Sequence, residues 1–134
     1  MPETIPFSER GREAQILLAV VVPFVFGAIV GIVLGASAGV YWILSAVAGI
    51  GAILAGLEHP DARSGALRGL VIGAVYGIGL LLAHAVAGTD AKVSLGGFPP
   101  LVIVIDAVVG AVLSAIGGSI GRARSRRGAA ARRS

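Results

Sequence analysis

Two ionisable side chains, Asp106 and His84, lie within long apolar stretches of the sequence. Asp106 is the only charged residue between positions 93 and 120, and no charged residue occurs between positions 70 and 89. A carboxylate deep in a bilayer costs roughly 2.5–3.5 kcal/mol on insertion scales, so such residues usually face a bundle interior or water. If His84 meets Asp106, the pair could hold a proton or a cation, because histidine titrates near neutral pH. The alternative is a structural role, with Asp106 packed as a neutral acid and His84 reaching water or headgroups.

Other catalytic chemistry has little support in this sequence. The chain has no cysteine, which excludes disulfides, thiolate metal sites and thiol catalysis. It contains no phosphate-binding loop, HExxH motif, nucleophile elbow or redox pair. Ser114 is two helical turns from Asp106 on the same segment, so no catalytic triad is indicated. We therefore expect neither an enzyme nor a bound cofactor or metal.

The composition places the chain among integral membrane proteins. Hydrophobic residues make up 56% of its 134 residues and charged residues 13%, about half the fraction usual in soluble domains. The charges are also unevenly distributed, since none occurs between positions 14 and 57. A soluble chain of this length has too little interior to bury such segments. The sequence predicts an all-α, polytopic membrane protein.

Four crossings account for the apolar segments. As one helix, the charge-free 44 residues from 14 to 57 would be about 66 Å long, twice the hydrocarbon core. A break at 35–39 divides them. Pro60 and the turn-rich stretch before Pro99 and Pro100 set the remaining boundaries. We expect a transmembrane domain over 14–121 with helices near 14–35, 40–58, 65–88 and 100–121, a cytoplasmic N-terminal segment at 1–13 and a disordered tail at 122–134.

The distribution of Lys and Arg predicts the orientation. With four crossings, ten arginines fall on the side of the two termini, and Lys92 alone falls on the other. Because positive residues favour the cytoplasmic side, both termini are expected in the cytoplasm and the helices in the cell membrane. The alternative is that residues 1–38 are a cleaved signal peptide ending at Ala36-Ser-Ala, although their apolar run exceeds the usual length.

Glycines recur every fourth residue in two of the segments. Small residues at this spacing let helix backbones approach closely in lipid, so these positions are predicted helix-packing sites. A stripe of small residues follows Asp106 at helical spacing. The set comprises Gly27, Gly31, Gly35, Gly39, Gly65, Gly69, Gly73, Gly77, Gly110 and Ser114. The alternative for the glycines is a pore lining or a sliding interface.

The spacing also suggests an internal repeat. The glycines align the first segment with the third, and 46–52 aligns without gaps on 107–113. The fold is therefore predicted as two similar glycine-rich helical hairpins related by a twofold axis along the membrane normal.

Charged residues cluster where the helices should meet the inner surface. Glu58 and Arg68 fall at similar depths and could pair, with Asp61 and Arg63 between them. The arginines of the tail fit a topology signal and attraction to anionic lipid, because no aromatic residue interleaves them as nucleic-acid binding would favour. They are Arg122, Arg124, Arg126, Arg127, Arg132 and Arg133.

Two functions remain open from the sequence. The favoured hypothesis is a structural or accessory protein that associates with its own copies or a larger membrane complex through glycine-rich helix faces. The alternative is an oligomeric small channel or transporter for protons or cations that uses Asp106 and His84.

Overall fold

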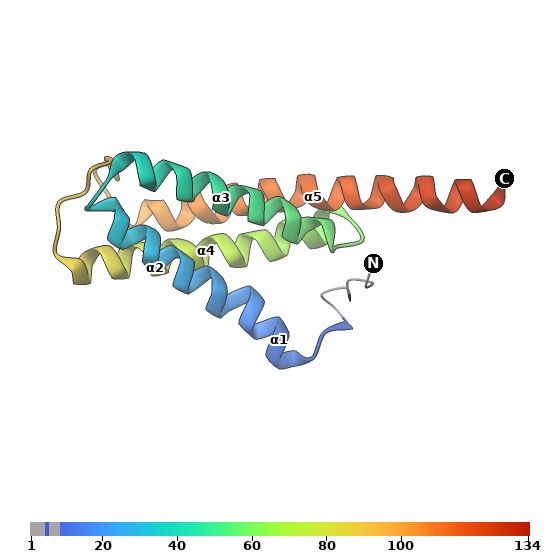
Figure 1. Cartoon of the computed structure of the whole chain (residues 1–134), viewed down its shortest axis with the longest axis horizontal. Coiled ribbons are helices and arrows are strands. Elements are labelled where there is room, and N and C mark those ends of the chain that lie inside the picture. The colour runs from blue at the N-terminus through green and yellow to red at the C-terminus, as the bar shows by residue number, and fades with distance from the viewer. Residues whose placement is uncertain (1–4, 6–8) are drawn as a thin grey trace.

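A computed structural model of the chain describes residue 5 and residues 9–134, so part of the predicted segment 1–13 lies outside the described residues. The described part is helical and contains no strand. Four helices are long and apolar enough to cross a membrane (Figure 1). The first comprises α1 (Arg12–Ile16), η2 (Leu17–Val21) and α2 (Val22–Leu34), and it is followed by α3 (Ala38–Leu57), α4 (Ala62–Ala87) and α5 (Leu101–Arg133).

The outer surface is apolar and the interior is composed largely of small residues. The buried hydrophobic side chains are few: Val30, Leu34, Ala52 and Leu80. Large side chains such as Ile43 and Val104 are instead more than half exposed. This distribution is compatible with a membrane protein, because lipid tails solvate apolar side chains as well as a protein core does.

The helices pack unequally. Extensive contacts join α4 to α5 and α2 to α4, and α3 packs mainly against α5. By contrast, α2 and α3 contact each other only sparingly, and α1 diverges from the other helices toward the N-terminus (Figure 1). The two predicted hairpins therefore differ in packing, with the first splayed and the second closely packed.

A π-helical turn lies just before Pro23. Proline has no N–H, and its ring clashes with the carbonyl four residues earlier. The wider turn of η2 directly precedes this position, and Pro23 is the second residue of α2. The clash of the Pro23 ring is thus accommodated by the π segment directly upstream, a common solution within long helices.

The loop of residues 88–100 joins α4 to α5 at the end of the bundle opposite the turn between α3 and α4 (Figure 1); we call this end outer and the opposite end inner. The loop folds back over the ends of α2 and α3. Gly88 ends α4 in the left-handed conformation, with a φ of 63°, and its N–H donates to the His84 carbonyl. The N–H of Lys92 donates to the carbonyl of Leu34 at 2.8 Å. Val93 and Leu95 pack against the buried cluster of Val30, Leu34 and Leu80. The loop is thus attached to the bundle on its outer side.

The C-terminal residues differ from the disordered tail expected at 122–134. They continue α5 to Arg133, so that this helix projects beyond the bundle (Figure 1). Alanine and arginine are strong helix formers, and a helix that is already nucleated extends at low cost. The amino-acid composition of this tail therefore did not predict its helical backbone.

Candidate functional site

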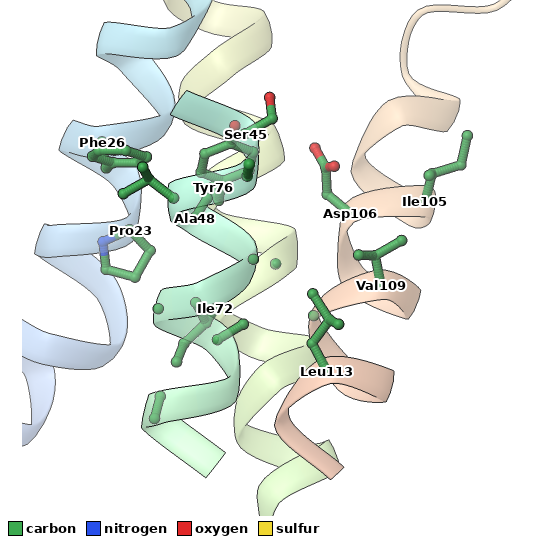
Figure 2. Close-up of a pocket in the computed structure, with 18 of the residues that line it drawn as sticks. Pro23, Phe26, Ser45, Ala48, Ile72, Tyr76, Ile105, Asp106, Val109 and Leu113 are labelled. Carbon is green, nitrogen blue, oxygen red and sulfur yellow. The ribbon is translucent and has the colours of Figure 1, made fainter. Parts of the chain in front are cut away.

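A cavity of about 1040 Å³ lies between the helices. Its walls come from α2, α3, α4 and α5, and Val93, Ser94, Leu95 and Gly96 of the outer loop contribute to it. Most lining side chains are apolar, among them Pro23, Phe26, Ile72, Val109 and Leu113 (Figure 2). The splayed arrangement of α2 and α3 leaves this space open, because no close contact between these helices fills it.

Asp106 contributes a carboxyl group to the cavity wall. Figure 2 shows its side chain pointing from α5 into the space between α5, α3 and α4. Its backbone lies against Gly73 of α4, and its Oδ2 atom lies beside Gly77, where an added Cβ would be 3.0 Å away. Oδ2 is buried and accepts no hydrogen bond from any residue that the structure describes. Asp106 is therefore held close to α4 with part of its hydrogen-bonding capacity unused.

Three hydroxyl groups lie near Asp106. Tyr41 and Tyr76 both line the cavity, and each interacts electrostatically with Asp106. Ser45 also lines the cavity, and its hydroxyl lies close to those of both tyrosines. The ring of Tyr76 lies 6.3 Å from that of Phe26, centroid to centroid, so α2 also supports this group. The outer half of the cavity thus carries a small polar cluster on otherwise apolar walls.

The predicted pair of His84 and Asp106 does not form. His84 is absent from the cavity lining, and its Nδ1 atom is buried without a hydrogen-bond partner among the described residues. Gly77 is the residue of α4 that faces Asp106, and His84 follows it by seven positions. This spacing places His84 about 10 Å farther along the helix axis. About two helical turns along α4 therefore separate His84 from the residue that faces Asp106.

An ion-pair cluster lines the inner end of the cavity. Glu58 accepts from Arg68 at 3.0 Å, the pair expected from the sequence, and from Arg10 at 2.9 Å. Arg68 also donates to the carbonyl of Ala55 at 3.5 Å. All three charged residues line the cavity, and only 9% of the Arg68 side chain is exposed. This contact holds Arg10, which lies just before α1, against the C-terminal end of α3.

The other residues of the inner cluster lie outside this contact. Asp61 caps α4 by accepting the Ser64 N–H at 2.8 Å, and this hydrogen bond lowers the pKa of Asp61. Burial, followed by the charge of Arg68, lowers the pKa of His59 in the same loop. Arg63 is exposed. Their positions indicate a structural role at the turn between α3 and α4.

The structure brings most of the predicted packing glycines into close helix contacts. Gly27 and Gly31 lie against the backbone of Tyr76 and Leu80, where an added Cβ would fall within 2.9 Å of a carbonyl carbon. The glycines of α4 meet the backbone of α5 in order: Gly65 at Ser114, Gly69 at Gly110, Gly73 at Asp106 and Gly77 at Ile103. These faces are therefore occupied within one chain.

Two predicted glycines make other contacts. Gly35 lies against the Thr89 side chain, and a Cβ added at Gly39 would meet no atom of another helix within 4 Å. Further close approaches involve glycines that the spacing did not single out. Gly56 and Gly117 join α3 to α5, and Gly79 joins α4 to α2.

Ser114 joins three helices. It is fully buried, and its hydroxyl donates to the carbonyl of Ala52 at 2.8 Å. The backbone of Ser114 lies against both Gly56 of α3 and Gly65 of α4. The small-residue stripe of α5 therefore serves contacts with two neighbours.

Tyr41, Ser45 and Arg10 were missed as site residues in the sequence. The signal for the first two was available, since Tyr41 and Ser45 are four residues apart and share a face of one helix. Arg10 had no such signal, because its pairing depends on how the N-terminal segment returns to the bundle. Within the described residues, no group of three or more His, Cys, Asp or Glu side chains could hold a metal ion.

Comparison with known proteins adds no further constraint, since no family model, curated protein or solved structure matches the chain. The functional argument therefore depends on the geometry of this cavity.

Proposed function

We propose that the chain is a small membrane carrier that moves protons or cations through the cavity at Asp106. The observation that carries this proposal is the Asp106 carboxyl in the cavity wall, with Oδ2 buried and unpartnered among the described residues. Ionisable residues within membranes are rare because they are costly, and they commonly mark ion or proton pathways. His84 has no part in this site, because it does not line the cavity.

The accessory function favoured by the sequence has less support from the geometry. Its argument was that the glycine faces would bind other chains. Gly27, Gly31 and the four glycines of α4 instead contact helices of the same chain. The cavity is likewise built by one chain. Association into a homo-oligomer or a larger membrane complex stays a prediction. The contacts of these glycine faces do not call for a second chain.

The proposal includes an orientation. The chain is placed in the cell membrane with both termini in the cytoplasm, because ten arginines lie on that side and one lysine on the other. The ion-pair cluster of Arg10, Glu58 and Arg68 then faces the cytoplasm, and the 88–100 loop faces outward. The nearest arginines of the α5 extension, Arg122 and Arg124, would meet anionic headgroups at the inner surface.

Proton flux into proteoliposomes tests the function. Vesicles containing a pH-sensitive dye receive an acid pulse, and the wild-type protein is compared with Asp106→Asn between about pH 5 and 8. Asp90→Asn is the matched control, because Asp90 is exposed in the outer loop. We expect flux from the wild type and the control and none above empty vesicles from Asp106→Asn. Equal flux from all three folded proteins would contradict the role of Asp106.

A further inference from the structure

We propose that the ligand of this cavity is a monovalent organic cation with an apolar or aromatic body, bound with its charge against Asp106. This inference rests on the proposed function and specifies the substrate class. The argument uses the charge of the site, its walls, its volume and the position of the neighbouring charges.

The charge of the site fits one weakly hydrated cation. Asp106 supplies a single carboxylate, and Oδ2 has no donor among the described residues. Ca²⁺ and Mg²⁺ take six or more oxygen ligands, and Zn²⁺ usually takes four ligands. The described residues contain no group of acidic or imidazole side chains that could provide such a shell. An organic ammonium or phosphonium ion is bound instead by one carboxylate and by contact with apolar surface.

The side chains that line the cavity suit the apolar or aromatic body of such a cation. Phe26, Tyr41 and Tyr76 line the cavity together with Trp42, which is 61% exposed, so that four of the seven aromatic residues of the chain contribute to it. Aromatic faces attract organic cations, and quaternary ammonium groups are recognised in this way. Ile72, Val109 and Leu113 add aliphatic surface around them. The combination favours an amphiphilic ion over a small hydrophilic one.

The volume of the cavity is in the range found for small-molecule binding sites. Sites for small molecules usually have volumes of about 300–1,000 Å³, and this partly open cavity measures about 1040 Å³. A proton pathway needs only a chain of water molecules, so a space of this size is unexplained by proton transfer alone. A cation of some twenty non-hydrogen atoms would occupy part of it and contact both α2 and α5.

Neighbouring charges place the bound cation in the outer half. Arg10 and Arg68 lie at the inner end and repel a cation there, although Glu58 engages both guanidinium groups. Arg68 precedes Gly73, the residue that faces the Asp106 backbone, by five positions, or about 7.5 Å along α4. The charge of the ligand is therefore expected beside Asp106, between Tyr41 and Tyr76.

Two probes of the same shape and opposite charge test the inference. Tetraphenylphosphonium and tetraphenylborate are titrated separately into the full chain in detergent. Binding is followed by equilibrium dialysis and by emission of Trp42, the single tryptophan of the chain, which lines the cavity. The variants are Asp106→Asn and the control Asp90→Asn. Trp42→Leu, followed by dialysis alone, tests the aromatic wall.

We expect saturable binding of tetraphenylphosphonium to the wild type and to Asp90→Asn. Asp106→Asn should weaken it roughly tenfold or more, because a close charge contact is lost. Trp42→Leu should weaken it less, and tetraphenylborate should show no saturable binding. Equal affinity of Asp106→Asn and wild type for tetraphenylphosphonium, or preference for the borate, would overturn the inference.

The two proposals can fail separately. If proton flux depends on Asp106 but no tetraphenylphosphonium binds, the substrate class is wrong and the proposed carrier function stands. If the probe binds through Asp106 but neither proton flux nor uptake of the labelled probe exceeds that of empty vesicles, the ligand class is correct and the carrier function fails.

Discussion

Asp106 lies against Gly77, with its Oδ2 atom beside the position that a Cβ of residue 77 would occupy, at 3.0 Å. The missing side chain at Gly77 makes room for the carboxyl group between α4 and α5. One of the predicted packing glycines thus also shapes the site. The close helix packing is thereby linked to Asp106, the one acidic group that the described residues place in the outer half of the cavity.

Glycine-to-alanine substitution should destabilise the chain at glycines in close helix contacts and should not destabilise it at glycines without such contacts. Gly31→Ala would place a Cβ 2.9 Å from the Leu80 carbonyl carbon, whereas Gly51→Ala meets no atom within 4 Å. We expect Gly31→Ala to lower the free energy of unfolding by about 1–3 kcal/mol through overpacking. Gly51→Ala should be neutral or stabilising by up to about 1 kcal/mol, because alanine is the better helix former. Thermal unfolding in detergent measures both, and equal effects would contradict the assigned contacts.

Ser114→Ala should weaken the contact between α3 and α5. It removes a buried hydrogen bond to the Ala52 carbonyl, and hydrogen bonds between membrane helices contribute about 0.6 kcal/mol on average. Ser119→Ala is the control, because its exposed hydroxyl bonds only to Ala115 of the same helix. A stability loss confined to Ser114→Ala supports this role. A larger loss in Ser119→Ala would argue against it.

The stability of the chain should fall on acidification, in part through His59. Burial and Arg68 lower its pKa, whereas the unfolded chain keeps a value of about 6.5. The folded state therefore binds the proton less well, so stability linked to His59 is present above about pH 6.5 and is lost as pH falls through the folded pKa. His59→Gln should show a smaller drop in melting temperature on acidification than the wild type. An equal or steeper drop would contradict this.

The absence of cysteine makes single-cysteine labelling a clean test of orientation. Ser94 is exposed in the outer loop, and Ser134 follows the end of α5. In intact cells, a thiol reagent that cannot cross the membrane should label Ser94→Cys and should reach Ser134→Cys only after the cells are opened. The reverse pattern would place the termini outside.

The sequence was sufficient for some features and insufficient for others, for identifiable reasons. Charge-free runs locate the four long helices, because a charge is costly in lipid. Glu58 and Arg68 pair because both lie at helix ends beside one short turn. The relation of His84 to Asp106 was not predictable, because apolar helices carry little information on the axial register between α4 and α5. The packing of Gly77 against Asp106 sets that register.

The cavity could not be predicted from the sequence either. It exists because α2 and α3 splay apart, and no residue pattern in either helix indicates this. The helix beyond residue 121 also differs from the prediction, although local sequence does explain it. There, local propensity to form a helix outweighs a composition typical of disorder.

The central claim is that Asp106 makes the cavity attract cations, and labelling of Ser45→Cys tests it most directly. Ser45 lines the cavity, whereas Val108, an exposed residue two positions after Asp106, does not, so Val108→Cys is the control. In proteoliposomes, a cationic methanethiosulfonate should modify Ser45→Cys faster than an anionic reagent of similar size. The difference should vanish in the double variant with Asp106→Asn, and Val108→Cys should react with neither. Equal rates for the two reagents in the presence of Asp106 would contradict the account.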